Sequence, residues 1–284
     1  MFAHIAFGLF VSFVGYAYLA IKPPSPKICG SAGGPPVTSP RVKLDNGRHL
    51  AYKERGVAKE QAKHKIIEVL KELQIYIVAF DRAGYGESDP NPRRSVKSEA
   101  FDIQELADKL QLGPKFYVIG LSIGAYAVYG CLKYIPHRSC PCGSLDSFLV
   151  ALLSRQAIER SLKRAARSTT RSDLEILKQL AGAPKQDQGK VIQQGVHESL
   201  HRDLMVAFGK WDFEPTDISD PFPNNDGCVH IWQGYEDKVF PFELNRYLSQ
   251  QLPWIRYHEV GDAGHLLIYN ETHCEAVFKA LVSS

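Results

Sequence analysis

The stretch that decides the fold is Phe116-Tyr117-Val118-Ile119-Gly120-Leu121-Ser122-Ile123-Gly124. Four apolar, mostly β-forming residues lead into the pattern Gly-x-Ser-x-Gly, and residues 125–134 follow with the composition of a helix. This order predicts a strand, a sharp turn and a helix, with the serine hydroxyl raised above the end of the sheet. Glycines flank the serine because such a turn brings backbone too close for a Cβ atom. Because the pattern alone is common by chance, its meaning depends on the rest of the chain.

The overall composition is that of an ordinary globular protein. The chain has 284 residues, of which 44% are hydrophobic and 23% charged. Its net charge of +3 is too small to indicate a nucleic-acid partner. The six cysteines are irregularly spaced, and Cys140 and Cys142 form the one close pair. We therefore expect free thiols, which favour a reducing compartment.

The N-terminus contains a long apolar run. Residues 1–21 include about 20 consecutive apolar positions, enough for a helix to span a bilayer. A cleaved signal peptide ending near Gly15-Tyr16-Ala17 is the alternative, but no basic residue precedes the run. Lys22 and Lys27 follow it, so we expect a transmembrane signal anchor with the bulk of the chain in the cytosol. The sequon Asn270-Glu271-Thr272 would favour the opposite, lumenal side.

A tether and the start of a domain follow. Residues 22–40 are rich in Pro, Gly and Ser and read as an extended tether. The domain is expected to span residues 41–284. It opens with strands at 41–44 and 49–52 around Asp45-Asn46-Gly47, a good hairpin turn.

The next elements predict a doubly wound sheet. Residues 75–80 form an almost continuous apolar run, which is typical of a strand buried on both faces. Turn-forming residues occupy 81–90, and residues 99–112 have helical spacing. With the strand before Ser122, this order predicts a mostly parallel sheet that binds ligands at the carboxyl ends of its strands.

The middle of the domain has a different pattern. Residues 145–171 have the spacing of a basic amphipathic helix, either a surface helix or a cap that touches anionic lipid. We expect a shortened helical cap over about residues 139–220, with further helices at 172–180 and 191–208. Regular alternation returns after it, predicting in turn a strand, a helix, a strand and a helix at 228–232, 243–252, 255–260 and 271–282.

Two later turns supply the partners that a serine nucleophile needs. A serine hydroxyl requires a base to take its proton, and the base requires a carboxylate to orient it. Asp237 and His265 each follow a predicted strand, and the chain order is serine, acid, histidine. That order is typical of α/β-hydrolases rather than of other serine-protease folds.

At these residues the sequence resembles the α/β-hydrolase family, in a membrane-anchored, plant-like branch with a proline-rich tether. The resemblance is carried by Asp81 to Ser88, Gly120 to Gly124, Gly234 to Asp237, and Gly264-His265. It implies the α/β-hydrolase fold and a serine hydrolase, esterase-like or lipase-like, that acts on small-molecule carboxylic esters or lipids. No cofactor and no metal are implied.

The same resemblance assigns roles to four residues. Ser122 is the nucleophile, His265 the base and then the acid, and Asp237 the carboxylate that orients it. The backbone N–H of Ile123 is one oxyanion donor. Glu236 is adjacent to Asp237 and is an alternative acid. Taken singly, His265 also fits a hydrogen-bonded loop histidine and Asp237 a helix N-cap.

Two departures from the family concern the neighbours of the central strand. The family has a strand that ends in His-Gly and gives the second oxyanion N–H, whereas residues 65–73 lack His-Gly and fuse strand and helix. The family also has a further parallel strand after Pro136-His137-Arg138, where this chain continues with Ser139-Cys140-Pro141. Segments therefore look missing, and losing one oxyanion donor typically costs ~10²–10³ in rate.

Two rival functions remain open at this point. One is a catalytically inactive α/β-hydrolase fold that binds a ligand or acts as a scaffold, since a fold does not decide function. The other is a zinc-dependent hydrolase, because His197-Glu198-Ser199-Leu200-His201 fits His-Glu-x-x-His. Zinc chemistry also requires a third ligand, and no pattern recommends Asp212, Glu214 or His230 for that role.

Overall fold

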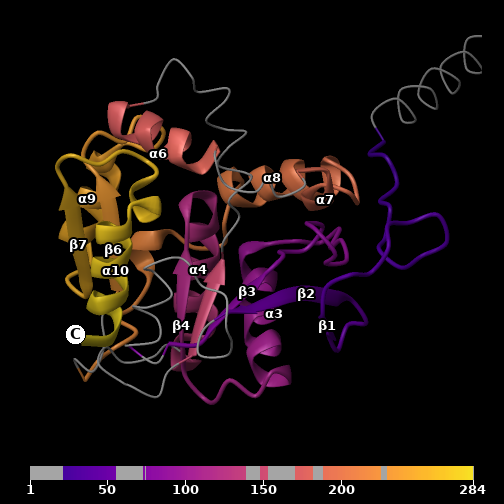
Figure 1. The fold of residues 1–284 in the computed structure, drawn as a ribbon. Coiled ribbons are helices and arrows are strands. Elements are labelled where there is room, and N and C mark those ends of the chain that lie inside the picture. Colours follow the sequence, from indigo (N-terminus) through magenta and orange to yellow (C-terminus); the bar gives the residue numbers. More distant parts are fainter. Residues whose placement is uncertain are drawn as a thin grey trace, which may run out of the picture.

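A computed structural model describes residues 22–55, 73, 75–138, 148–152, 170–181, 188–224 and 229–283. It has the mixed α/β architecture that the sequence predicts (Figure 1). Its strands form a five-stranded sheet in the order β1-β2-β3-β5-β4 and a separate pair, β6-β7. The strands are β1 (Arg41–Lys43), β2 (His49–Arg55), β3 (Ile77–Phe80), β4 (Phe116–Gly120), β5 (Phe148–Leu152), β6 (Val229–Gly234) and β7 (Ile255–Val260).

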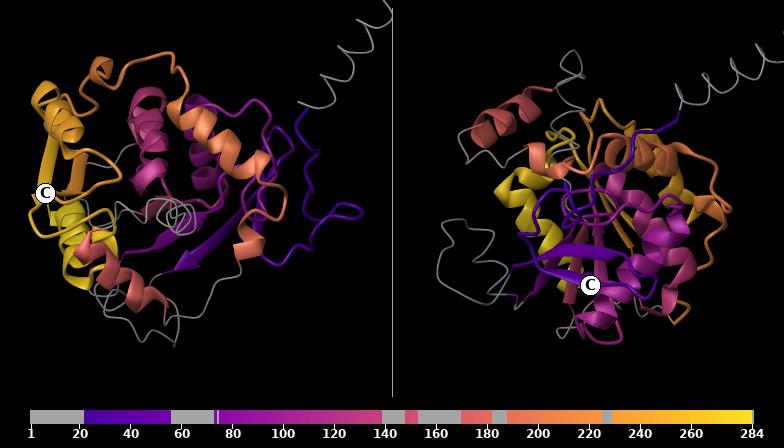
Figure 2. Two further views of the ribbon diagram at one scale, coloured as in Figure 1. Left: turned by 90° about the horizontal axis from the view of Figure 1, so that it is seen from above. Right: turned by 90° about the vertical axis from the view of Figure 1, so that its right-hand side faces the viewer.

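Helices pack around these strands. The helices of the described chain are α3 (Val96–Lys109), α4 (Ala125–Tyr134), α6 (Arg171–Ala181), α7 (Gln188–Val191), α8 (Arg202–Phe208), α9 (Phe242–Gln251) and α10 (Glu271–Ser283). Seen from above and from the side, α6 lies beside the yellow C-terminal segment, and α8 lies over the strands and helices coloured magenta (Figure 2). The described helices α6, α7 and α8 thus lie at one end of the sheet (Figure 1).

The first hairpin is as predicted. β1 and β2 are antiparallel, with Arg41 opposite Ala51, and Gly47 has a positive φ of +86° in the turn between them. A glycine adopts this φ without steric cost, so the Asp-Asn-Gly turn fixes the register of the pair. β2 in turn runs antiparallel to β3.

The central strands correct one prediction. β5 runs parallel to β3 on one side and to β4 on the other, so residues 148–152 form a strand and not the start of a basic helix. Their sequence, Phe-Leu-Val-Ala-Leu, is a continuous apolar run, which suits a strand with neighbours on both sides. Two ladders of backbone hydrogen bonds outweigh a local helical spacing. The rest of the expected basic helix, up to residue 169, lies outside the described residues.

β5 also supplies one of the two neighbours of β4 that, from the sequence, were expected to be missing. On one side β4 pairs with β5 along its whole length, from Phe116 to Gly120. In the described chain β4 is the last strand of the five-stranded sheet, and the parallel pair β6-β7 stands apart from it. The segment that should carry the His-Gly loop falls in residues 65–72, which lie outside the described residues.

The two faces of the sheet are covered by different helices. Val78 and Phe116 pack with Ile103 of α3 in the main core. Adjacent residues of the same strands point the other way, and Ile77 and Tyr117 pack in a second cluster with Phe278 of α10. This alternation is the period of two expected of strands, and it gives the doubly wound arrangement that the sequence predicts.

The C-terminal strands and helices agree with prediction. β6 and β7 are parallel in register from Val229 opposite Ile255 to Gly234 opposite Val260, with α9 between them in the chain. α10 closes the described chain.

The helix predicted at 191–208 is instead broken into pieces. α7 ends at Val191, and Gly195 has a φ of +122°, which no regular helix allows. A π-helical turn, η3 (His197–His201), then leads into α8. The predicted helix at 172–180 is present as α6.

Residues 22–40, expected to be a tether, contact the domain. The carboxylate of Glu87 accepts hydrogen bonds from the backbone N–H of Thr38 at 2.7 Å and of Ser39 at 2.9 Å. The side chain of Gln194 accepts the N–H of Cys29 and donates to backbone carbonyls of the loop after β3. This segment therefore lies against the loop 84–89.

The expected membrane anchor requires a correction. In the described ranges, no helix has both the length and the apolar character needed to cross a bilayer. Residues 1–21, on which that expectation rested, lie outside the described residues. We therefore withdraw the assignment of this chain as a single-pass membrane protein with an N-terminal anchor and a cytosolic bulk.

Candidate active site

The turn after β4 has the strained geometry of a raised serine. β4 ends at Gly120, Ser122 begins the short helical turn η1 (Ser122–Gly124), and α4 follows at once. Ser122 has a φ of +51°, a region that costs a residue with a Cβ roughly 1–2 kcal/mol. A Cβ on Gly120 would lie 2.7 Å from the carbonyl oxygen of Gly124, so only glycine fits there. The strand, turn and helix predicted from the sequence are all present.

The structure brings the three predicted residues together at this turn. His265 Nε2 lies 2.9 Å from Ser122 Oγ, and His265 Nδ1 lies 2.8 Å from Asp237 Oδ2. Ser122 lies in the turn after β4, Asp237 in the turn after β6 and His265 in the turn after β7. His265 is 143 positions from Ser122 and 28 from Asp237 in the chain, yet the three side chains form one continuous line of hydrogen bonds.

The line of hydrogen bonds fixes which nitrogen of His265 carries a proton. An ionised carboxylate only accepts, so Nδ1 must donate its hydrogen to Asp237. Nε2 then carries the lone pair that can accept the Ser122 hydroxyl proton. The side chains of His265 and Asp237 are only 8% and 6% exposed, whereas Ser122 is exposed. The base and acid are shielded from water, and the hydroxyl is open to it.

Asp237 is held by its own loop. Its Oδ1 accepts the backbone N–H groups of Val239 at 2.8 Å and Phe240 at 2.9 Å, and Gln233 Nε2 donates to its Oδ2 at 3.2 Å. The N-cap of α9 is Pro241, so Asp237 is not the cap of that helix. Glu236 is exposed to solvent. Of the two adjacent acids, the structure brings only Asp237 to the histidine.

The predicted oxyanion donor lies at the start of a helical run. Ile123 follows Ser122 in η1, and α4 continues the run to Tyr134. The first N–H groups of such a run have no acceptor within the helix, and its positive end favours negative charge. Ile123 is thus in the part of the turn where a negative oxygen would be stabilised.

A fourth residue, Asp173 of α6, holds the histidine loop and was not singled out from the sequence. Its carboxylate accepts the backbone N–H groups of His265 at 3.1 Å and Leu266 at 2.8 Å. The two partners are 92 and 93 residues away in the chain. No local pattern marks such a contact, because it depends on where α6 packs.

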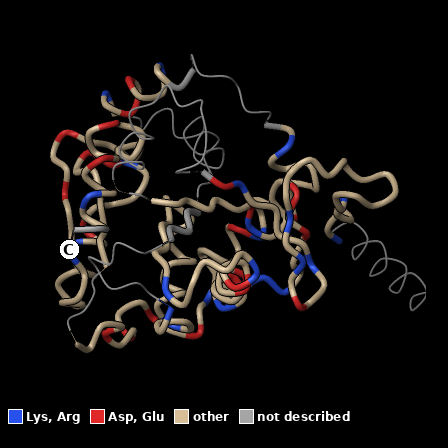
Figure 3. Tube along the Cα trace, turned by 60° about the horizontal axis from the view of Figure 1, so that its bottom comes forward, with Lys and Arg blue, Asp and Glu red and all other residues tan. Residues whose placement is uncertain are grey.

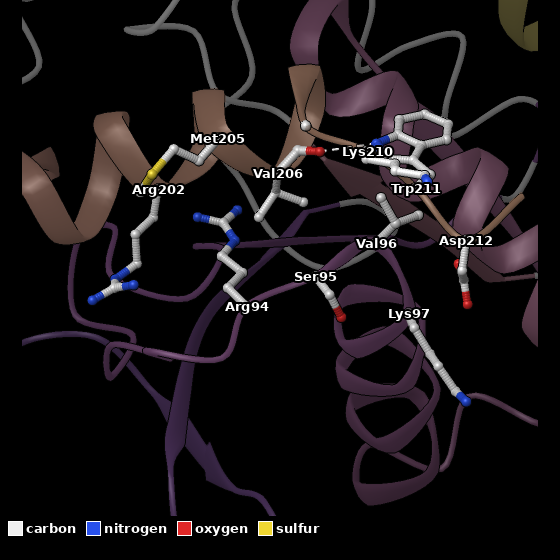
Figure 4. A pocket seen from close by; sticks show the side chains of 11 residues that line it. Arg94, Ser95, Val96, Lys97, Arg202, Met205, Val206, Lys210, Trp211 and Asp212 are labelled. Atoms are coloured by element: carbon white, nitrogen blue, oxygen red, sulfur yellow. Dashed lines mark hydrogen bonds between the residues drawn. The ribbon is translucent and has the colours of Figure 1, made fainter.

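One cavity borders this region and another lies elsewhere in the described chain. One, of about 350 Å³, borders Asp237 and is lined by Thr170, Arg171, Tyr235, Glu236, Asp237 and Lys238. Another, of about 480 Å³, lies between α8 and the start of α3 and contains none of the triad residues (Figure 4). Arg202 stands at one end of it, and Lys97 and Asp212 stand at the other. Its two arginines, Arg94 and Arg202, already pair with Glu99 and Glu198.

Charged residues of both signs are interspersed along the described chain (Figure 3). A buried cluster of charged residues and tyrosines lies beneath α8, apart from the relay at Ser122. It consists of Arg82, Tyr85, Arg94, Glu99, Tyr126 and Asp203. Asp203 has no exposed side-chain surface and pairs with Arg82 and, at 2.7 Å, with Arg94. The hydroxyls of Tyr85 and Tyr126 also donate to it, each at 2.9 Å. This cluster fastens α8 to the loop after β3.

The His-Glu-x-x-His segment serves a structural purpose. Glu198, which a metalloprotease would use as its base, is buried and forms a two-pronged ion pair with Arg202 at 2.5 and 2.9 Å. Within the described ranges, no group of three or more His, Cys, Asp or Glu side chains could hold a metal ion. His197 and His201 thus lie on one helical turn in which the carboxylate of Glu198 is already paired with Arg202.

Comparison with known proteins identifies the fold. An esterase from Exiguobacterium antarcticum is 18% identical, with a TM-score of 0.51, over 87% of this chain and 100% of its own. An enol-lactonase from Burkholderia xenovorans is 16% identical, with a TM-score of 0.56, over 86% and 98%. An α/β-hydrolase fold protein from Chitinophaga pinensis is 19% identical, with a TM-score of 0.55, over 86% and 98%. No curated protein matches the chain.

At these identities the solved structures show the fold alone. The family model is more informative, because it matches the sequence itself over residues 50–280, most of the chain. That range contains the turn at Ser122 and the loops of Asp237 and His265. The chain therefore belongs to the alpha/beta hydrolase family.

Proposed function

We propose that this protein is a serine hydrolase that cleaves carboxylic esters, lipid esters included, through Ser122, His265 and Asp237. The observation that carries the proposal is the unbroken relay from Ser122 Oγ to His265 at 2.9 Å and from His265 to Asp237 at 2.8 Å. The positive φ of Ser122 supports it, since strain of this kind is concentrated at functional sites.

The geometry accounts for each proton in the reaction. His265 Nε2 takes the proton of the Ser122 hydroxyl as Oγ attacks the ester carbonyl carbon. The imidazolium that forms is stabilised by the Asp237 carboxylate on Nδ1. The N–H of Ile123 donates to the oxyanion of the tetrahedral intermediate. His265 then gives its proton to the leaving alcohol, which leaves the acyl group on Ser122. Water next attacks this acyl group while His265 takes the proton of the water, and His265 returns that proton to Ser122 Oγ as the acid is released.

The ester class is supported by the family and by the names of structural neighbours. An esterase and an enol-lactonase share this fold, and both names describe cleavage of a carbonyl–oxygen bond. The cavity beside Asp237 is lined by charged residues of both signs, Arg171, Glu236 and Lys238. We therefore propose no particular acyl or alcohol group.

Active-site labelling with a fluorophosphonate tests the proposal. Such a reagent reacts only with a serine whose base and oxyanion donors are in place. We expect the protein to be labelled at Ser122 and Ser122→Ala to remain unlabelled. Hydrolysis of short-chain 4-nitrophenyl esters should fall by about 10⁶-fold in the same variant. A folded protein that is not labelled would instead be a binding module or scaffold with this fold.

A further inference from the structure

The contact between α6 and the histidine loop links the least family-like part of the chain to the proposed base. Asp173 lies in the first turn of α6, and it is 1% exposed. Its Oδ2 accepts the N–H of His265 and its Oδ1 the N–H of Leu266. Hydrogen bonds from backbone N–H groups to a carboxylate are stronger than those between neutral groups. Both oxygens are thus used to hold two consecutive peptide groups.

Asp173 is itself fixed from both sides. Thr170 Oγ1 accepts the backbone N–H of Asp173 at 3.2 Å, which caps the first turn of α6. One turn further along, Ile176 packs against Leu266 in a small buried cluster. The helix and the loop therefore meet through one polar and one apolar contact.

Gly264 shows how closely the loop approaches this carboxylate. A Cβ on Gly264 would lie 2.4–2.5 Å from the carboxylate atoms of Asp173. Its φ lies outside the left-handed region, so the need for glycine arises from this contact and not from backbone conformation. The glycine before the histidine is matched to an acid 91 positions away, the difference between 264 and 173.

We propose that Asp173 is a positioning residue for His265, so that α6 holds the imidazole in line with Ser122 and Asp237. The catalytic consequence of this inference rests on the proposed function, whereas the contact itself does not. The imidazole sits 2.9 Å and 2.8 Å from its two partners, and its backbone is anchored by Asp173 alone among the described side chains. A displacement of about 1 Å in such a relay costs on the order of 10²-fold in rate.

The first test is Asp173→Asn, which keeps the shape but presents an amide NH₂ in place of one acceptor. The matched control is Glu175→Gln, the same change of charge at an exposed position on the same helix. We expect the maximal rate of fluorophosphonate labelling to fall by about 10²-fold in Asp173→Asn, with the reagent's apparent binding constant within threefold. Glu175→Gln should label as the unmodified protein does. Equal labelling of Asp173→Asn and Glu175→Gln would overturn the proposal.

A second measurement does not depend on activity. Amide hydrogen exchange of the peptide that contains His265 and Leu266 should be at least about tenfold faster in Asp173→Asn, while peptides of α3 stay unchanged. If the unmodified protein is not labelled, the proposed function fails, and this exchange still decides whether Asp173 holds the loop. Unchanged exchange at His265 and Leu266 would refute the contact even in an active enzyme.

A double substitution tests the close approach directly. Gly264→Ala should disturb the loop in the presence of Asp173, because the new methyl group meets the carboxylate. Once Asp173→Ala has removed that carboxylate, adding Gly264→Ala should increase the exchange rate by less than twofold. Independent, multiplying effects of the two substitutions would show that the two residues do not touch.

Discussion

Two hydrogen-bonded clusters in this protein are each built around an aspartate and are used in opposite ways. In the relay at Ser122, an acid, a histidine and a hydroxyl form an open line that ends at the surface. In the cluster beneath α8, Asp203 accepts from two arginines and two tyrosines and is sealed from solvent. Burial raises the pKa of Tyr85 and Tyr126, so both phenols stay protonated as donors.

The difference teaches where chemistry can occur. In the cluster beneath α8, both carboxylate oxygens of Asp203 are occupied by donors, so this carboxylate serves to fasten elements together. In the relay at Ser122, His265 Nε2 keeps a lone pair, and Ser122 faces solvent in a strained turn. His265 and Ser122 are therefore accessible for chemistry, whereas the Asp203 carboxylate is not.

The largest expected effect comes from breaking the open relay at its acid. Asp237→Asn should lower kcat/KM for an ester by about 10⁴-fold, because the amide favours the wrong tautomer of His265. Steady-state kinetics on a purified, folded variant measure this. Glu236→Gln is the matched control and should change the rate by less than threefold, since Glu236 is exposed. A larger loss in Glu236→Gln than in Asp237→Asn would exchange the roles of the two acids.

Breaking the closed cluster should affect stability before activity. Asp203→Asn leaves the buried charges of Arg82 and Arg94 without their shared carboxylate. We expect the free energy of unfolding to fall by about 3–5 kcal/mol, as measured by urea denaturation. Asp217→Asn, at an exposed position, should change it by less than about 0.5 kcal/mol. A loss under about 1 kcal/mol in Asp203→Asn would mean that the arginines are not sealed from water.

Backbone strain distinguishes the serine turn from an ordinary one. Ser122→Gly should be more stable than Ser122→Ala by about 1 kcal/mol, because only glycine adopts a φ of +51° without steric cost. Thermal unfolding of the two inactive variants compares them directly. Gln111 has a φ of +55° at an exposed site, so Gly and Ala at position 111 should differ in the same direction. If Ala is as stable as Gly at 122 but not at 111, the turn at Ser122 is not strained.

A smaller effect concerns pH and the β6-β7 pair. Burial, with the nearby charges of His258 and Arg256, lowers the pKa of His230 to about 4. Above pH 6.5 this histidine is neutral in both states and has no effect. Between pH 6.5 and about 4 the unfolded chain binds a proton that the folded chain does not, so stability falls as the pH falls. His230→Gln should flatten this part of the stability curve, measured by urea denaturation at several pH values; an unchanged slope would contradict it.

Local patterns were sufficient for the elements and loops that carry the relay. The apolar run before Ser122 became β4, because a buried strand needs little else than continuous apolar β-formers. β7 formed where it was predicted although its sequence, Ile-Arg-Tyr-His-Glu-Val, mixes apolar and charged residues. Ser122, Asp237 and His265 were each singled out because they lie in a turn that follows a predicted strand. Their short motifs sit where the backbone changes direction, and that is a local property.

Long-range contacts decided what the patterns could not. Residues 148–152 have the spacing of a helix, yet they form β5, because β3 and β4 offer two rows of backbone partners. The helix expected at 191–208 is broken at Gly195, where the chain turns. Asp173 gave no signal, since its two partners become neighbours only after α6 has packed on the loop of His265.

The sequence by itself determined the strands of the sheet other than β5, the turn that strains Ser122 and the chemical types of its partners, because periodicity, glycines and residue order are written along the chain. Only the tertiary structure decided that Asp237 and not Glu236 meets His265 and that Asp173 holds the histidine loop. The physical reason is that hydrogen bonds act over about 3 Å, and the sequence does not say which distant groups come that close.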